Sequence, residues 1–416
     1  MPAPFVQAEL VEARESPPGR RETGLACARE ARLRTGAGRV LLAALFLALG
    51  ACRSVPLASD PTVPGSVPGP PAIFAIDWWV RLVAPPMWEY APRETAQPAV
   101  DFDTGRIIVL TRDGYVRSVS PENGKVEWEF KTLGPFNAGA LLREGIAYVP
   151  GGDGTLYALR LGSGELVWKY PSGEELATTP VFSGGKVLVA SQSDTLFAVD
   201  AASGKWVWQY RRDAPSGFTI RGAAAPRVDS GVAYIGFSDG TIVAVTVADG
   251  TAKWERSLTT SGGHQFLDAD ATPVLDDAGR LFVASYKDGV YSLDANTGEV
   301  QWHTARAGVT SLLPRGDVLV TAGDGQMGAL LSTDGKPLWS LDLEARAARQ
   351  PLLAHGLLVV PTNGALTFVD PSTGRARESW NPGKGVSATP GKAQNRLYVL
   401  SNLGLLYAMR LVGRGG

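Results

Sequence analysis

A tryptophan returns about every forty residues along this chain, each time at the same place in a repeated phrase. The phrase contains a short apolar run, an Asp-Gly type of turn, a second apolar run, a Gly-Lys or Gly-Glu turn, and then the tryptophan. A repeat of this period built from strand-length runs is typical of a β-propeller, in which each copy forms one blade. The complete phrases end at Trp128, Trp168, Trp208, Trp254, Trp302, Trp339 and Trp380.

Each phrase predicts four antiparallel strands. The apolar runs are short and rich in Val, Leu, Ile, Tyr and Phe, which favour strands. Dipeptides such as Asp153-Gly154 and Asp239-Gly240 separate two runs, and glycine tolerates the positive φ that a tight hairpin requires. A Thr-Gly or Ser-Gly turn then leads into the strand that bears the tryptophan. We therefore expect four-stranded blades, with the tryptophans packed between them.

The count of phrases predicts how the ring closes. An eighth phrase begins at Arg396 and reaches Leu411, but the chain stops before its tryptophan. The segment Ala75–Leu82, near the other end of the chain, contains Trp78 and Trp79 and has the pattern of the missing strand. We predict an all-β, eight-bladed propeller over residues 72–416, in which this N-terminal strand completes the last blade. Closure of this kind removes exposed strand edges.

The N-terminal region has the pattern of a signal peptide. Val40–Leu49 is an apolar run that is too short to span a bilayer, and arginines precede it. Leu49-Gly-Ala-Cys52 follows, which is a bacterial lipoprotein cleavage box, so we expect lipid on the thiol of Cys52. Residues 1–51 are interpreted as a signal peptide with an over-extended start. Residues 52–71 are interpreted as a proline-rich tether.

Composition argues against several classes of function. Cys27 and Cys52 are the chain's two cysteines, so removal of the signal and lipidation leave no thiol for a disulfide. The formal net charge of −1 gives no basic bias towards nucleic acid. The three histidines are far apart and lack the spacing of a metal site, and no Gly-x-Ser-x-Gly elbow occurs. We predict no catalytic residue, no metal and no cofactor.

The spacing of the tryptophans singles out two loops. The intervals from Trp128 onwards are 40, 40, 46, 48, 37 and 41 residues. The two longest carry their extra residues in 211–220 and 258–270, each between the last strand of one blade and the first strand of the next. Equivalent loops of neighbouring blades emerge side by side on one face. Long loops on a rigid scaffold are where binding is concentrated, so we expect a partner there.

The phrase with Tyr-Ala-Leu, Thr-Gly-Lys and Trp resembles the quinoprotein-like (PQQ-like) propeller repeat. The mature chain as a whole resembles the BamB family, whose members are lipoproteins of the outer-membrane β-barrel assembly machinery. Gly217–Pro226 and Leu267–Pro273 are similar to the two stretches with which that family binds the POTRA domains of the barrel insertase BamA. Carried over by position, the resemblance implies partner contacts at Phe218, Ile220, Arg221, Asp268 and Asp270.

This resemblance also implies a location and partners. Arg53 follows the lipidated cysteine in place of aspartate, which by the enterobacterial sorting rule favours the outer membrane, with the propeller facing the periplasm. The expected partners are a BamA-like POTRA-containing barrel insertase, other barrel-assembly lipoproteins and unfolded outer-membrane β-barrel clients. The membrane is contacted through the lipid alone, and nucleic acid is not a partner.

Other interpretations stay open at the level of sequence. Arg221 and the pair Asp268 and Asp270 form either partner contacts or bonds among themselves and to the loop backbone. A lipoprotein propeller that binds glycan or another periplasmic partner is an alternative function. A PQQ-dependent dehydrogenase is the least favoured, because the mature chain lacks the adjacent cysteine pair and any cluster of calcium ligands beyond the two aspartates.

Overall fold

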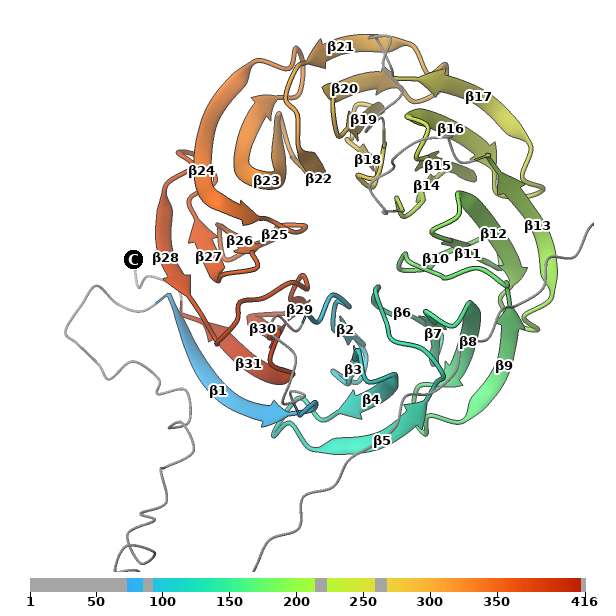
Figure 1. The fold of residues 1–416 in the computed structure, drawn as a ribbon, viewed down its shortest axis with the longest axis vertical. Helices are drawn as coiled ribbons and strands as arrows, with labels where there is room; N and C mark the ends of the chain where they lie inside the picture. The colour runs from blue at the N-terminus through green and yellow to red at the C-terminus, as the bar shows by residue number, and fades with distance from the viewer. Residues whose placement is uncertain (1–72, 85–92, 214–222, 259–267, 413–416) are drawn as a thin grey trace, which may run out of the picture. The chain divides into compact units, whose positions relative to one another are not determined.

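The computed structural model describes residues 73–84, 93–213, 223–258 and 268–412. Every regular element within these ranges is a β-strand, and the strands form eight antiparallel sheets around a common axis (Figure 1). In seven of the sheets the chain runs from the innermost strand to the outermost one, and in the eighth the outermost strand is β1 (Phe74–Arg81), from the N-terminal side. The predicted eight-bladed β-propeller is therefore confirmed.

Blades 1 to 4 follow one another along the chain. Blade 1 comprises β2 (Ala99–Val100), β3 (Ile107–Leu110), β4 (Tyr115–Val119) and β5 (Val126–Lys131). Blade 2 comprises β6 (Leu141–Arg143), β7 (Ile146–Pro150), β8 (Thr155–Arg160) and β9 (Leu166–Pro171). Blade 3 comprises β10 (Val181–Ser183), β11 (Lys186–Ala190), β12 (Thr195–Asp200) and β13 (Trp206–Arg211). Blade 4 comprises β14 (Arg227–Asp229), β15 (Val232–Gly236), β16 (Thr241–Thr246) and β17 (Ala252–Ser257).

Blades 5 to 8 complete the ring. Blade 5 comprises β18 (Val274–Leu275), β19 (Arg280–Ser285), β20 (Gly289–Asp294) and β21 (Val300–Thr304). Blade 6 comprises β22 (Val309–Arg315), β23 (Val318–Leu331) and β24 (Pro337–Ala347). Blade 7 comprises β25 (Leu352–Ala354), β26 (Leu357–Pro361), β27 (Leu366–Val369) and β28 (Ala376–Trp380). Blade 8 comprises β29 (Gly391–Ala393), β30 (Arg396–Leu400), β31 (Leu405–Leu411) and β1 (Phe74–Arg81).

Blade 6 reaches the four-stranded form through a tight fold-back within β23. The first half of β23 pairs with β22 and the second half pairs with β24. The hydroxyl of Thr321 donates to the carbonyl of Gly328, 3.4 Å away, so the chain doubles back between these residues. Gly325 has a φ of 73° in the turn, a conformation that glycine adopts without strain. The continuous element is thus two strands of one hairpin.

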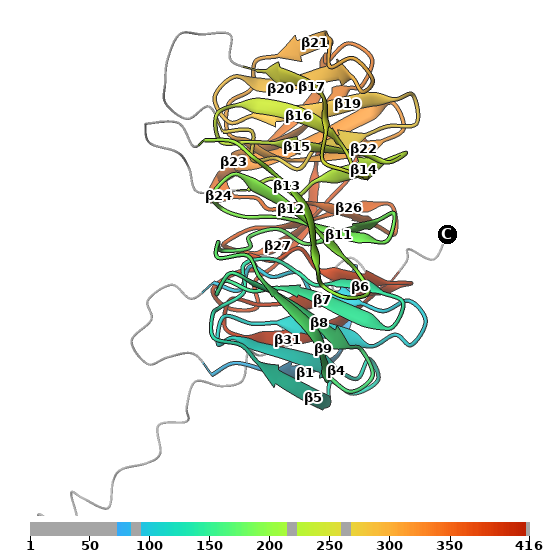
Figure 2. The ribbon, with the colours of Figure 1, turned by 90° about the vertical axis from the view of Figure 1, so that its right-hand side faces the viewer.

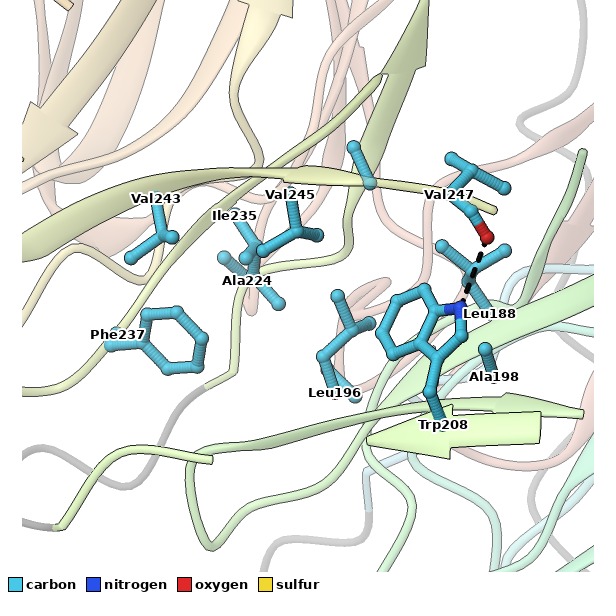
Figure 3. Close-up of a cluster of buried hydrophobic side chains, with 12 residues drawn as sticks. Leu188, Leu196, Ala198, Trp208, Ala224, Ile235, Phe237, Val243, Val245 and Val247 are labelled. Atoms are coloured by element: carbon cyan, nitrogen blue, oxygen red, sulfur yellow. Dashed lines mark hydrogen bonds between the residues drawn. The ribbon is translucent and has the colours of Figure 1, made fainter. Parts of the chain in front are cut away.

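The hydrophobic core of the propeller is a ring of clusters between blades. Each of eight clusters draws its buried side chains from two neighbouring blades. Figure 3 shows the cluster between blades 3 and 4, where Leu196 and Trp208 of blade 3 pack against Ile235 and Val245 of blade 4. Burial of such side chains stabilises the fold by about 1.5–3 kcal/mol each. The ring therefore depends on contacts between blades as well as on the sheets.

The recurring tryptophans join neighbouring blades in a constant geometry. The indole N–H of Trp208 donates to the carbonyl of Val247 in blade 4 at 3.0 Å (Figure 3). Gly250, three residues further on, has a φ of 77°, and a Cβ there would lie 2.7 Å from the same indole ring. The same pairing of an indole with a glycine turn occurs at Trp78, Trp128, Trp168, Trp254, Trp302 and Trp339.

The ends of the chain close the ring as predicted. β1 pairs antiparallel with β31, from Phe74 opposite Leu411 to Arg81 opposite Leu405. Asp77 of β1 accepts a hydrogen bond from Arg396 and another from Arg410, both at 3.1 Å. Trp78, rather than Trp79, makes the equivalent indole bond, to the carbonyl of Pro121 in blade 1.

Trp380 departs from the other tryptophans for a topological reason. In blade 8 the outermost strand comes from the N-terminal end, so no chain turn joins it to β31. The turn that the other indoles bond to is therefore missing beside Trp380. Its ring instead packs edge-on against Phe74 and Tyr407, with centroids 5.8 and 4.9 Å away.

Two glycines of blade 2 separate the role of the indole contact from that of backbone conformation. Gly164 has a φ of 73°, and a Cβ there would lie 2.5 Å from Trp128, whereas Gly145 has a φ of 76° and open space around it. We expect Gly145→Ala to lower the free energy of unfolding by about 1–2 kcal/mol through backbone strain alone. Gly164→Ala adds overpacking and should lower it by about 2–5 kcal/mol. Equal losses in guanidinium denaturation would contradict the proposed role of the contact.

Candidate functional site

The antiparallel order of strands gives the propeller two distinct faces, seen in profile in Figure 2. One of them, here called the loop face, carries the turn between the second and third strands of each blade and the loops that lead from one blade to the next. The predicted extra residues, 211–220 and 258–270, fall in the connections on either side of blade 4, and the described ends of both connections lie on this face. A third long loop, 82–98, leads from blade 8 to blade 1. The count of intervals began at Trp128 and therefore missed it.

The predicted partner contacts divide between described and undescribed parts of the chain. Phe218, Ile220 and Arg221 lie outside the described residues, as does the predicted lipidation site Cys52. Asp268 and Asp270 are described, at the end of the loop that leads into blade 5. Their role as partner contacts stays a prediction.

The segment 268–270 is held between the turns of two blades. The backbone N–H of Ala269 donates to the carbonyl of Phe237 in blade 4 at 3.1 Å, and the N–H of Tyr286 in blade 5 donates to the carbonyl of Asp268 at 2.9 Å. A Cβ at Gly236 would lie 2.1 Å from the carbonyl oxygen of Ala269, so glycine is required for this close approach. The side chain of Asp268 is fully buried. Asp268 is thus placed to fix the loop from within.

Asp270 has an unusual protonation state for a carboxyl near a protein surface. Burial, followed by the negative charges of Asp268 and Asp194, raises the pKa of Asp270 to about 8. Near neutral pH its carboxyl is therefore mainly protonated and able to donate a hydrogen bond. A cation from a partner would reverse this by favouring the carboxylate.

Sequence reasoning missed two neighbours that shape this part of the loop face. Asp194 has a φ of 57° and accepts a hydrogen bond from the backbone N–H of Ser238 at 3.0 Å, which links the turns of blades 3 and 4. Arg212 donates to Asp239 and to Glu255, each at 2.8 Å. These bonds connect the turns of blades 3 and 4 and place three acidic side chains, Asp194, Asp239 and Glu255, around Arg212. No spacing in the sequence identified them, because the pairs join residues 27–44 positions apart.

The described residues contain no group of three or more His, Cys, Asp or Glu side chains that could hold a metal ion. The part of the chain that the structure describes also contains no helix long and apolar enough to cross a membrane.

Comparison with known families identifies the repeat. The family model described as outer membrane protein assembly factor BamB matches residues 112–322 and 306–408, which together span most of the propeller. The chain belongs to the BamB family. BamB of Salmonella typhimurium is 27% identical over 205 residues, covering 47% of this chain and 52% of that protein. The chain thus spans about half the length of the curated BamB relatives that it matches.

Solved structures share the fold. A crystal structure of BamB from Moraxella catarrhalis matches with a TM-score of 0.71 and 24% identity, over 82% of this chain and all of that one. A quinohemoprotein alcohol dehydrogenase from Comamonas testosteroni matches with a TM-score of 0.67 and 17% identity, over 83% of this chain and 77% of that one. At these identities the likeness establishes the propeller and no activity, so BamB proteins and dehydrogenases share one scaffold.

The raised pKa of Asp270 predicts how stability depends on pH. Unfolding returns the carboxyl to a pKa near 3.8, so between that value and about 8 the folded state holds a proton that the unfolded chain has lost. Stability is therefore lost as pH rises through this range. We expect the unmutated protein to lose stability relative to Asp270→Asn between pH 5 and pH 9 in urea denaturation. Asp277→Asn, at an exposed turn on the opposite face, should follow the unmutated protein, and superimposable curves for Asp270→Asn would refute the assignment.

Proposed function

We propose that this protein is a non-enzymatic scaffold of the outer-membrane β-barrel assembly machinery, anchored by lipid at Cys52 and facing the periplasm. Membership of the BamB family supports the assembly role, since the relatives of that name are outer-membrane protein assembly factors. The lipoprotein cleavage box and the proline-rich tether of residues 52–71 support the anchor. The tether allows the propeller to sit some distance from the membrane.

The docking surface is the loop face around blades 4 and 5. The observation that carries this proposal is the segment 268–270, which two blades hold in place between their turns. A segment fixed in this way loses little conformational freedom when a partner binds. The entropy cost of binding is therefore smaller, and more of the interaction energy appears as affinity. Asp194, Asp239 and Glu255 outnumber Arg212, which pairs with two of them, so the surface around them favours a basic partner and orients it.

In the proposed complex, the partner is a BamA-like insertase that presents its POTRA domains to this face. Phe218 and Ile220 are proposed as apolar anchors at the centre, with Arg221 and Asp270 as polar contacts around them. Asp268 acts through the loop that it supports, because its side chain is fully buried. The propeller then orients the POTRA domains towards emerging β-barrel clients and other assembly lipoproteins.

The proposed scaffold role requires blades that keep fixed positions, and it requires no catalytic residues. The indole bonds between blades and the eight inter-blade clusters hold the strands that bear the two docking loops in fixed relative positions. Two docking loops that flank a single blade can therefore contact one partner domain while the blades that bear them keep their places.

Recovery of the partner from membranes tests the docking surface. We expect the lipidated protein, purified from outer membranes in mild detergent, to carry a POTRA-containing barrel protein with it. Arg221→Glu places a negative charge in the acidic docking surface and should reduce recovery of that partner by at least roughly tenfold, the effect of about 1.4 kcal/mol. Arg375→Glu makes the same change of charge at an exposed turn on the opposite face and should leave recovery intact.

Failure to recover such a partner with the unmutated protein would overturn the assembly role. Equal losses for Arg221→Glu and Arg375→Glu would preserve the assembly role but exclude the loop face as the docking surface.

A further inference from the structure

The axial channel of the propeller contains a second polar site on the loop face. Residues just before the innermost strands of seven blades line a cavity of about 390 Å³. Hydroxyl and amide side chains predominate in this lining, which includes no Asp or Glu. The side chains used below are Thr95 of blade 1, Arg349 and Gln350 of blade 7, and Ser387 and Thr389 of blade 8.

Hydrogen bonds between blades hold this lining in place. The amide of Gln350 donates to the carbonyl of Leu312 in blade 6, and the hydroxyl of Thr389 in blade 8 donates to the carbonyl of Gln350, both at 2.9 Å. In blades 2 and 3, the backbone N–H of Gly139 donates to the hydroxyl of Thr179 at 3.2 Å. The channel wall is therefore a built structure, with side chains that neighbouring blades fix in position.

Arg349 is the single charged residue of the lining. The backbone N–H of Arg349 donates to the carbonyl of Pro361, and the N–H of Ala177 donates in the same way to the carbonyl of Ala190. Arg349 in blade 7 and Ala177 in blade 3 therefore occupy equivalent positions. Ala223, Ser387 and Thr95 precede their innermost strands in the same way, and all three are small and neutral. An arginine at this position is not needed to build a blade.

The guanidinium of Arg349 has one positive and one negative charge near it. Burial and the neighbouring charge of Arg93 lower its pKa, and the more favourable charge of Asp324 opposes this. The side chain of Arg349 is nevertheless exposed, and it lines the axial cavity. Within the described residues, neither arginine forms an ion pair or a side-chain hydrogen bond. Arg349 thus remains free to bind an anion.

Two further donors in the lining are also free. The hydroxyls of Thr95 and Ser387, in the two blades that follow Arg349 around the ring, have no hydrogen-bond partner among the described residues. Asp270 occupies the corresponding position in blade 5, where its raised pKa keeps it mainly uncharged near neutral pH. The channel mouth therefore offers one positive charge and unused hydroxyl donors, and its lining includes no Asp or Glu.

We propose that this channel mouth binds the carboxylate of a small polar molecule or of a peptide chain end, with Arg349 as the anchor and Ser387 and Thr95 beside it. The two parallel N–H groups of a guanidinium match the two oxygens of a carboxylate. The single positive charge of the lining is balanced by one carboxylate group. This inference does not depend on the proposed assembly role, because it concerns the channel rather than the outer loops.

Calorimetric titration of the full lipidated chain in detergent tests the proposal at constant ionic strength. The probes are succinate, triglycine with a free carboxyl end, triglycine amide and inorganic phosphate. We expect a carboxylate probe to bind, and Arg349→Ala to weaken binding by at least roughly tenfold, the effect of losing a charged hydrogen bond. Tighter binding of free triglycine than of succinate or triglycine amide would indicate a chain end as the ligand, and the reverse order a small molecule.

The controls keep the result decisive. Alanine occurs naturally at this position in blades 3 and 4, so Arg349→Ala should fold, which the same denaturation midpoint as the unmutated protein would verify. Arg375→Ala removes an exposed arginine on the opposite face and should bind like the unmutated protein. The proposal is overturned if no carboxylate binds, if Arg349→Ala binds equally well, or if phosphate binds more tightly than every carboxylate.

Discussion

The propeller depends on one repeated interaction, the bond from a tryptophan indole to the turn of the next blade. At seven of the eight junctions between described blades the indole N–H reaches a carbonyl at 3.0 Å while the ring lies against a glycine that has no room for a side chain. The hydrogen bond and the close contact together tie one blade to the next. Because the turn belongs to the following blade, the interaction passes from blade to blade until it reaches the seam. There β1 supplies the last strand and Trp78 makes the last such bond, to blade 1.

A ring held in this way can carry different surfaces on one scaffold. The same fold occurs in alcohol dehydrogenases and in BamB proteins. In this chain the long loops and acidic turns gather around blade 4, while Arg349 faces the channel between Arg93 and Asp324. Asp270 links the two regions, since it ends a docking loop and holds the position in blade 5 that Arg349 holds in blade 7. Its protonation therefore bears on both surfaces.

Much of the fold could be predicted from the sequence because the repeat is local. Strand-length apolar runs, Asp-Gly turns and evenly spaced tryptophans report interactions within a blade or with the next one, and the closing strand followed from the missing eighth tryptophan. The exceptions concern topology. Trp380 has the spacing of the other tryptophans, yet the chain ends leave no turn for it to contact. The loop 82–98 was missed because it spans the seam, where the counting of intervals began.

The candidate site was less predictable, because burial and distant contacts decide it. The resemblance to BamB placed Asp268 and Asp270 together, but the two differ in a way that spacing does not reveal: one is fully buried, and the pKa of the other is raised to about 8. Asp194 accepts a hydrogen bond that connects the turns of blades 3 and 4. Arg349 lies near the charges of Arg93 and Asp324. A comparison of the residues before each innermost strand does single out Arg349, since small neutral residues stand at that position in several other blades.

Site-specific photo-crosslinking in intact outer membranes tests the central claim most directly. A crosslinking residue at Lys287, exposed in the blade 5 turn on the loop face, would be compared with one at Arg375 on the opposite face. The account predicts that position 287 links to a POTRA-containing barrel protein and that position 375 does not. Absence of that product at position 287, or equal yields at both positions, would contradict the claim that the loop face docks on the assembly machinery.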